Sequence, residues 1–194
     1  MRNALALAAA IIASTGAIPY IIDITRGKTH PNLVTWVTYT LINIVGGFAA
    51  LNAGEPRTAF LNLFGALATG SIAAMGIKHG VRTYSKFDVA CQILAVIGLI
   101  VWQLTGVPAI AVAIALFVML IASLPTWRHA WIAPYAETWQ GYLIGAAGSA
   151  LTVATLSGFN FVALGFPIAI ILNNSTIVGI VLIRRRRPAM QRAR

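Results

Sequence analysis

Charged residues are scarce in this sequence. Only 9% of its 194 residues are charged and four are acidic, whereas 59% are hydrophobic. A soluble domain carries about 25% charged residues, so the composition argues against a water-soluble protein. The single cysteine, Cys91, excludes an intramolecular disulfide framework. The sequence also lacks H-E-x-x-H, C-x-x-C and phosphate-loop motifs, as well as paired acids inside an apolar run. We therefore expect no enzymatic activity, no catalytic residues, no metal site and no cofactor.

Long hydrophobic runs are what the sequence does contain. Seven of them approach the ~20 residues that a helix needs to cross ~30 Å of hydrocarbon. They are residues 4–24, 33–51, 59–77, 89–104, 107–124, 139–156 and 159–183. The stretch 89–124 would form one helix of roughly 54 Å, and Thr105-Gly106-Val107-Pro108 supplies the turn that splits it. The sequence predicts an all-α membrane protein with seven transmembrane helices.

The basic residues indicate the orientation in the membrane. Of fourteen Lys and Arg residues, six lie in the gaps after the first, third and fifth runs, and six lie in the tail. The positive-inside rule then places the N-terminus outside and the C-terminus in the cytoplasm. A net charge of +10 is also typical of nucleic-acid binding. Membrane topology explains it better, so we expect no nucleic-acid partner and a tail that contacts anionic lipid.

One residue pattern occurs twice. The segments HPNLVTWVTY (30–39) and APYAETWQGY (133–142) both contain P-x-x-x-T-W-x-x-Y. A shift of 103 residues superposes Pro31 on Pro134, Thr35 on Thr138, Trp36 on Trp139 and Tyr39 on Tyr142. Both copies precede an apolar run on the same predicted side, so the two units share one orientation and a linker helix must separate them. We expect a parallel 3+1+3 repeat of triple-helix bundles: residues 1–80, linker helix 81–106, residues 107–183, and a basic cytoplasmic tail 184–194.

With these motifs, the chain resembles the seven-helix SWEET/PQ-loop superfamily, especially small bacterial members that carry R-G-K-T-x-P-x-x-x-[ST]-W. The resemblance implies that four prolines act as hinges for alternating access: Pro19, Pro31, Pro125 and Pro134. None of them is followed by the glutamine of lysosomal amino-acid carriers. Both second helices carry small residues where sugar carriers of this kind hold a central tryptophan.

The motif residues have two interpretations each. A proline inside a helix removes a hydrogen bond and kinks the helix, which suits Pro19 and Pro125 near the ends of apolar runs. Pro31 and Pro134 could instead simply begin helices. The repeated aromatic residues either form a gate or belong to an interfacial aromatic belt; they are Trp36, Trp139, Tyr39 and Tyr142.

Four asparagines within the apolar runs are candidate substrate-binding residues: Asn43, Asn173, Asn174 and Asn62. An amide suits a neutral polar solute because it offers both donors and acceptors. The resemblance implies a substrate-binding asparagine on the third helix of each repeat, which Asn173 and Asn62 could provide. The alternative is an interhelical clamp between asparagines. We expect three glycines to leave room for the ligand: Gly46, Gly47 and Gly148.

Two acidic residues lie near the predicted cytoplasmic side. Asp23 is a candidate proton-coupling group because desolvation favours a protonated carboxyl. The alternative is an interfacial ion pair between Asp23 and Arg26 or Lys28. Glu137 is expected either to pair with Arg128 or to be solvated.

The leading functional hypothesis is a carrier or facilitator that moves a small neutral polar solute by rocking the two bundles. One alternative is a vitamin-precursor facilitator similar to nicotinamide-riboside carriers, which a central aromatic cage would favour. Another is a non-transporting seven-helix receptor or scaffold. The expected partners are a small-molecule substrate and membrane lipid, and a homo-oligomer is compatible with the sequence.

Overall fold

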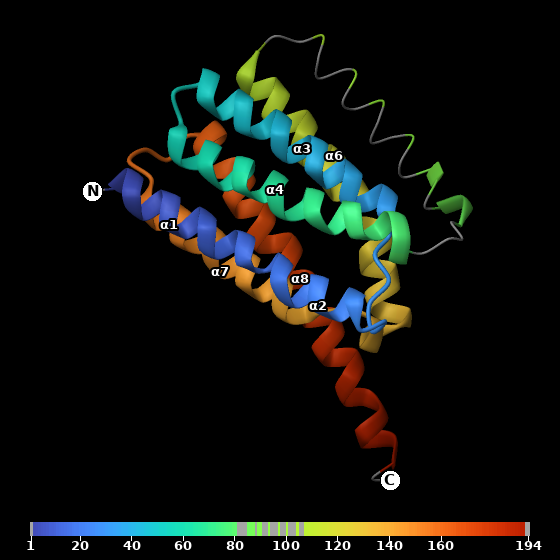
Figure 1. The fold of residues 1–194 in the computed structure, drawn as a ribbon. Helices are drawn as coiled ribbons and strands as arrows, with labels where there is room; N and C mark the ends of the chain where they lie inside the picture. The colour runs from blue at the N-terminus through green and yellow to red at the C-terminus, as the bar shows by residue number, and fades with distance from the viewer. Residues whose placement is uncertain are drawn as a thin grey trace.

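The computed structural model describes residues 2–80, 85–87, 89–90, 93, 97, 100, 104 and 107–192. This part of the chain is helical apart from short connections and contains no β-strand (Figure 1). The elements are α1 (Arg2–Thr15), α2 (Ala17–Thr25), α3 (Leu33–Asn52), α4 (Pro56–His79), α6 (Pro108–Ile132), the 3-10 helix η1 (Pro134–Ala136), α7 (Trp139–Thr155) and α8 (Phe161–Arg192). The predicted all-α class is confirmed.

Five segments are long and apolar enough to cross a membrane. They are Arg2–Thr25, Leu33–Asn52, Pro56–His79, Val112–Ile132 and Phe161–Arg186. Helix α7 has 17 residues, which makes it about 26 Å long, and it is not among the five. The expected span 89–104 lies largely outside the described residues. The helices are thus compatible with a membrane protein, while a total of seven spans stays a prediction.

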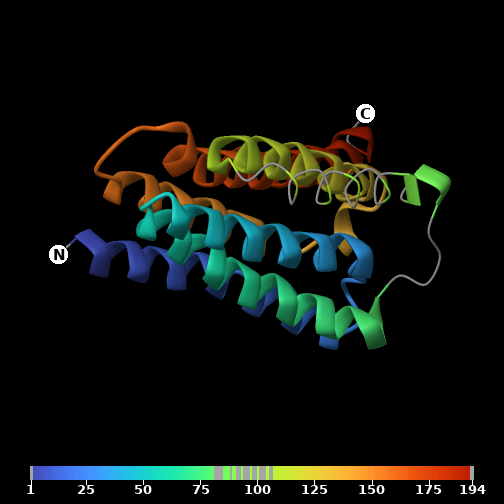
Figure 2. The ribbon, with the colours of Figure 1, turned by 90° about the horizontal axis from the view of Figure 1, so that it is seen from above.

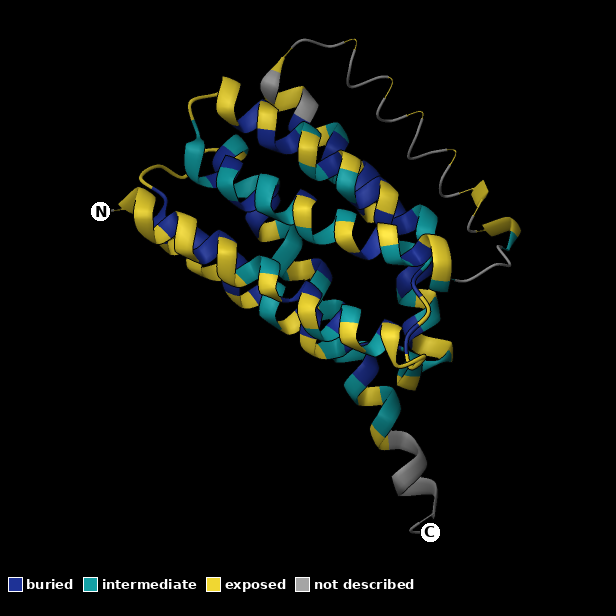
Figure 3. Ribbon diagram, in the orientation of Figure 1, coloured by how far each residue is buried: buried dark blue, intermediate teal, exposed yellow. Residues whose placement is uncertain are grey.

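Exposed positions run along the long helices (Figure 3), and many of them carry large apolar side chains. Phe48 on α3, Leu67 on α4, Phe117 on α6 and Leu172 on α8 are each more than half exposed. Such extensive apolar exposure is unusual for a soluble monomer. Lipid tails would cover it without cost.

The long helices enclose a common interior. Helix α4 contacts both α1 and α3, and α8 contacts both α6 and α7. Helix α1 also contacts α7, and α3 contacts α6, which closes a ring in the order α1, α4, α3, α6, α8, α7. Seen from above, these helices lie side by side along one common direction (Figure 2). We call α1–α4 the first half and α6–α8 the second half.

The halves meet at two seams that differ in kind. At the α1–α7 seam the backbones nearly touch: a Cβ built on Gly148 would lie 2.5 Å from the backbone nitrogen of Ala13. A Cβ on Gly16 would lie 2.5 Å from the carbonyl oxygen of Gly141. At the α3–α6 seam a hydrogen bond of 2.7 Å joins the hydroxyls of Tyr39 and Ser123. Small residues therefore hold one seam, as is typical between helices in lipid, and a polar pair holds the other.

The glycines that were expected to leave room for a ligand are instead packed against neighbours. The space beside Gly46 holds the ring of Phe166, the space beside Gly47 holds Leu63, and Gly148 faces α1. The expectation was wrong because the room beside a glycine depends on which neighbouring helix residue faces it. That register cannot be derived from a single helix.

The four prolines occupy two kinds of position. Pro125 lies inside α6, and Pro19 lies in α2, three residues after Gly16 separates α2 from α1. Pro31 precedes α3, whose N-cap Asn32 accepts a hydrogen bond of 3.3 Å from the backbone N–H of Thr35. Pro134 begins η1. Thus Pro31 and Pro134 lie in connections rather than in helix interiors, and the hinge role of the four stays a prediction.

Candidate functional site

A cavity of about 130 Å³ lies between the two halves. Residues from α1, α2, α3, α4, α6, α7 and α8 form its walls. A buried water needs ~10–15 Å³ on this measure, so the cavity has room for on the order of ten waters. Most of the lining is apolar, and its amide groups come from three asparagines.

Three of the four candidate asparagines line this cavity. The side chain of Asn43 donates from Nδ2 to the backbone oxygen of Tyr39 at 2.8 Å, one turn earlier on α3. Asn173 accepts a hydrogen bond of 2.8 Å at Oδ1 from Nε1 of Trp127, and its Nδ2 donates to Oδ1 of Asn174 at 3.4 Å. Asn173 thus lines the cavity and also bonds to another helix, through Trp127 of α6 rather than through another asparagine.

Two glycines on neighbouring helices make space for these amides. A Cβ on Gly65 would lie 2.8 Å from Oδ1 of Asn43, and a Cβ on Gly145 would lie 2.7 Å from Nδ2 of Asn174. Both glycines line the cavity themselves. Among the described residues, neither of these two amide atoms has a hydrogen-bond partner. The Asn43 acceptor and the Asn174 donor are therefore available to a solute.

Asn62 does not join the other asparagines. It is fully buried, and neither its Nδ2 nor its Oδ1 has a hydrogen-bond partner in the described structure. It lies beside Phe166, since both side chains approach the position that a Cβ on Gly46 would occupy. Phe166 lines the cavity and Asn62 does not.

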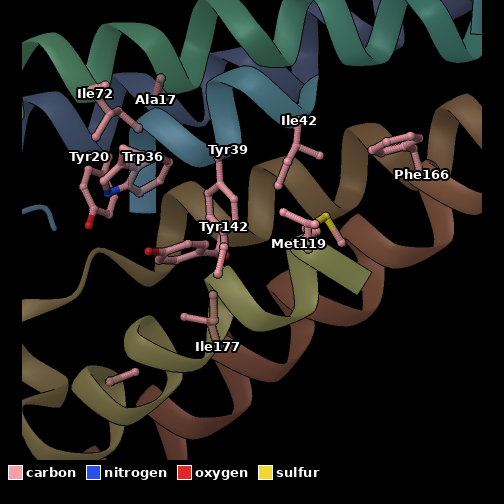
Figure 4. Packing of buried hydrophobic residues seen from close by; sticks show 14 of the residues in the cluster. Ala17, Tyr20, Trp36, Tyr39, Ile42, Ile72, Met119, Tyr142, Phe166 and Ile177 are labelled. Carbon is pink, nitrogen blue, oxygen red and sulfur yellow. The ribbon is translucent and has the colours of Figure 1, made fainter. Parts of the chain in front are cut away.

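Four aromatic residues meet between α2 and the first turns of α3 and α7. They are Tyr20, Trp36, Tyr39 and Tyr142, which we call the aromatic cluster. Figure 4 shows the four rings together, with Phe166 further along the bundle. The ring centroids of Tyr20 and Trp36 are 4.9 Å apart, and those of Trp36 and Tyr142 are 6.4 Å apart. All four side chains are buried and line the cavity.

The burial of the aromatic cluster decides one alternative. An interfacial belt would leave the rings at the surface, so that interpretation is wrong for Trp36, Tyr39 and Tyr142. Trp139, the fourth repeated aromatic, is half-buried at the edge of the core and does not line the cavity. Tyr20 was not predicted; its position directly after a candidate hinge proline is the only signal in the sequence.

At the end of the molecule where the α2–α3 and α6–α7 connections lie, hydroxyl groups connect the two halves. Oγ1 of Thr138 donates to Oδ2 of Asp23 at 2.8 Å and lies 2.9 Å from Oγ1 of Thr29. Both threonines are buried and Asp23 is half-buried. Within the described residues Asp23 forms no ion pair with Arg26 or Lys28, because its carboxylate faces the second half instead.

Glu137 is buried in the same region, with only 5% of its surface exposed. Its Oε1 lies 2.7 Å from Nδ1 of His129, and its Oε2 accepts a hydrogen bond of 3.2 Å from the hydroxyl of Tyr142. The expectation that Glu137 pairs with Arg128 or is solvated was therefore wrong. The sequence contained one indication that Glu137 is buried: the repeat aligns it with the apolar residue Val34 of the first copy.

Two arginines of α8, Arg184 and Arg185, bind backbone oxygens in and next to the connection that contains Glu137. The guanidinium of Arg185 donates from Nε to the carbonyl oxygen of Pro134 at 3.0 Å and from Nη2 to that of Glu137 at 2.9 Å. Nε of Arg184 donates to the carbonyl oxygen of Trp131 at 3.0 Å. These two arginines had been assigned only to the basic tail, because charge patterning carries no information about contacts with a distant loop.

No family model matches this chain, and no curated protein and no solved structure gives a match. Among the described residues there is also no group of three or more His, Cys, Asp or Glu side chains that could hold a metal ion. The functional interpretation therefore depends on the cavity, the aromatic cluster and the polar groups below it.

Proposed function

We propose that this protein is a membrane carrier or facilitator that moves a small neutral polar solute by alternating access. The observation that carries the proposal is the cavity between the halves, lined by Asn43, Asn173 and Asn174. A site between two bundles can be exposed to each side of the membrane in turn. Uncharged amides bind hydroxyl or amide groups of a solute without the large desolvation cost of a buried charge.

The order of the helices supports a repeat of two triple-helix bundles. In each half the third helix contacts both the first and the second, and the second helix of each half contacts the first helix of the other. Two copies related by an axis along the membrane normal would have these neighbours. With a linker helix at 81–106, the chain would have the parallel 3+1+3 layout of the SWEET/PQ-loop superfamily.

In this proposal the aromatic cluster is a gate and the prolines allow the helices beside it to bend. Pro19 and Pro125 lie within helices next to the cluster and could bend them locally. Pro31 lies in the connection between α2 and α3, and Pro134 begins η1 in the connection between α6 and α7. The fixed φ of proline limits the motion of each connection. Asp23 and Thr138 would add a hydrogen bond that closes the same end.

The aromatic rings also favour a second candidate, a heteroaromatic vitamin precursor similar to nicotinamide riboside. Five aromatic side chains line the cavity: Tyr20, Trp36, Tyr39, Tyr142 and Phe166. A planar ring stacked on them would gain about 0.5–1.5 kcal/mol per aromatic contact beyond area burial. Its ribose hydroxyls could bind the asparagines.

Uptake into proteoliposomes tests the proposal and separates the two candidates. The external mixture would contain hexoses, polyols, nucleosides and nicotinamide riboside, and mass spectrometry would identify the solutes inside. We expect selective entry with the native chain and none with Gly145→Leu, because that side chain would fill the space of Asn174. Gly158→Ala is the matched control, since no atom lies within 4 Å of its Cβ position. Equal entry with native and Gly145→Leu protein would contradict the proposal.

We also propose that the chain lies in a bacterial plasma membrane, as its resemblance to bacterial members of the superfamily implies, with its N-terminus outside, as the basic residues indicate. Ala53 and Lys78 are exposed residues near opposite ends of α4. In a Cys91→Ala background, a cysteine at Ala53 should react with an impermeant reagent from outside, and a cysteine at Lys78 only from inside. Reaction of both from the outside would mean that α4 does not span.

A further inference from the structure

Glu137 connects the cavity to the surface through two titratable neighbours. Of the acids that the structure describes, it alone is buried. Its Oε2 accepts from Tyr142, whose side chain lines the cavity, and its Oε1 contacts His129, whose side chain is 37% exposed. The contacts thus run from the cavity through Tyr142 and Glu137 to an imidazole that reaches solvent.

The groups around Glu137 include two that can exchange a proton with its carboxyl group, His129 and Tyr142. His129 faces it from α6, Tyr142 from α7 and Tyr20 from α2. Arg185 of α8 binds the backbone oxygen of Glu137. A buried carboxylate is costly unless a charge compensates it. A protonated His129 would supply such a charge at Oε1 of Glu137, and transfer of its proton to the carboxylate would leave both groups neutral.

We propose that the carrier moves a proton together with its solute and that Glu137 is the group that binds this proton; the inference rests on the proposed transport function. A hydronium ion in the cavity gives a proton to the Tyr142 hydroxyl as that hydroxyl gives its own to Oε2 of Glu137, which leaves water in the cavity and a neutral carboxylic acid beside a neutral His129. Rotation of the carboxyl group then brings this proton to the side of His129, whose Nδ1 accepts it. The imidazolium releases one proton to water, so one proton enters and one leaves.

The same loop links protonation to closure of the cavity. Thr138 follows Glu137 directly and bonds to Asp23 and Thr29 of the first half, while Arg185 holds the carbonyl groups of Pro134 and Glu137. A change in the contact between Glu137 and His129 would therefore act on the residue that joins the halves. This gives proton binding a direct mechanical connection to the gate.

The test uses proteoliposomes that contain the pH indicator pyranine, with the hexoses, polyols and nucleosides of the mixture described above added outside. With the native chain, the lumen should acidify as solutes enter. Glu137→Gln keeps the size of the side chain but cannot exchange a proton, so we expect acidification about 100-fold slower or absent. Exchange of solute between equal internal and external concentrations should persist, because exchange requires no net proton transfer.

Glu55→Gln is the matched control: Glu55 precedes α4 at the opposite end of the molecule, where it accepts a hydrogen bond from Asn160. This variant should acidify the lumen at the native rate. Acidification at the native rate with Glu137→Gln would overturn the proposal, as would its loss with Asp23→Asn instead. If Glu137→Gln also loses solute exchange, the variant His129→Gln is tested in its place. The proposal requires that His129→Gln loses acidification of the lumen and keeps solute exchange. Acidification at the native rate with His129→Gln overturns the proposal.

The same experiment separates failure of coupling from failure of transport. Native protein that admits solutes without any change in lumenal pH contradicts proton coupling and leaves the transport function standing. Native protein that admits no solute contradicts the transport function, and the coupling inference falls with it.

Discussion

The two copies of P-x-x-x-T-W-x-x-Y occupy corresponding places in the two halves but have different surroundings. In the first copy α3 begins soon after the proline, and Trp36 is buried against the cavity. In the second copy η1 intervenes before α7, and Trp139 is only half-buried and lies away from the cavity. The repeat thus specifies where a residue lies along a helix, whereas the preceding connection changes what its side chain contacts.

The tyrosines of the two copies show the same contrast. The hydroxyl of Tyr39 bonds to Ser123 in the other half, whereas the hydroxyl of Tyr142 donates to Glu137 in its own half. The first copy has Val34 at the position of Glu137, so it offers no carboxylate. The residue that is not repeated therefore decides which copy can take part in proton chemistry.

The largest expected effect concerns the two seams between the halves, because close backbone contact holds the α1–α7 seam and a polar side-chain pair holds the α3–α6 seam. Gly148→Ala would place a methyl group against the backbone of Ala13, which cannot move as a flexible side chain could. We expect a loss of about 3 kcal/mol or more, above the middle of the range for overpacking, and a melting temperature roughly 6–12 °C lower in detergent. Gly179→Ala, with nothing near its Cβ position, should not lower the melting temperature. An unchanged melting temperature for Gly148→Ala would mean that the α1–α7 seam is looser than described.

The next effect compares a buried asparagine inside the cavity with one outside it. Asn173→Leu removes a cavity amide and leaves Nε1 of Trp127 without its acceptor. We expect solute affinity to fall about five- to 150-fold, which corresponds to roughly 1–3 kcal/mol, together with a lower melting temperature. A melting temperature that falls while affinity is unchanged would identify Asn173 as a clamp only.

Asn62→Leu is the counterpart, because Asn62 is buried without hydrogen-bond partners in the described structure and lies outside the cavity lining. Removing such a group is close to neutral or stabilising. We therefore expect native solute affinity and a melting temperature at least as high as that of the native chain. Binding assays and melting curves on the same preparation measure both effects.

Particular residues show how far sequence reasoning reached. The helical class and three cavity asparagines followed from composition and depth, because polar groups are rare in apolar runs and usually have a purpose. Room for a ligand was expected beside three glycines that are in fact packed against neighbours, whereas the glycines that border the cavity amides are Gly65 and Gly145. The contacts of Glu137 depend on His129, Tyr142 and Arg185, which three different helices supply. Such contacts require the relative placement of helices, which no periodicity encodes.

The tyrosine hydroxyls provide a smaller and matched comparison. Tyr142→Phe would leave Oε2 of Glu137 buried without its donor, at a cost of about 1–3 kcal/mol. Tyr39→Phe should cost only about 0.5–1.5 kcal/mol, because Ser123 keeps its bond to the carbonyl oxygen of Met119. The melting temperature should therefore fall further for Tyr142→Phe. Equal decreases would contradict the different roles given to the two hydroxyls.

The smallest expected effect is that of Thr35→Val, and it is compared with Thr138→Val, the corresponding substitution in the second copy. Oγ1 of Thr35 is buried and has no hydrogen-bond partner among the described residues, so Thr35→Val removes an unsatisfied polar atom while keeping the shape. We expect a change between zero and a gain of about 1 kcal/mol. Thr138→Val would instead remove the donor to Asp23 and the neighbour of Thr29, at a cost of about 1–3 kcal/mol. Melting curves of the two variants, measured beside the native chain, should shift in opposite directions or leave Thr35→Val unshifted. A destabilised Thr35→Val would show that this hydroxyl has a partner, and the polar difference between the two copies would then disappear at this position.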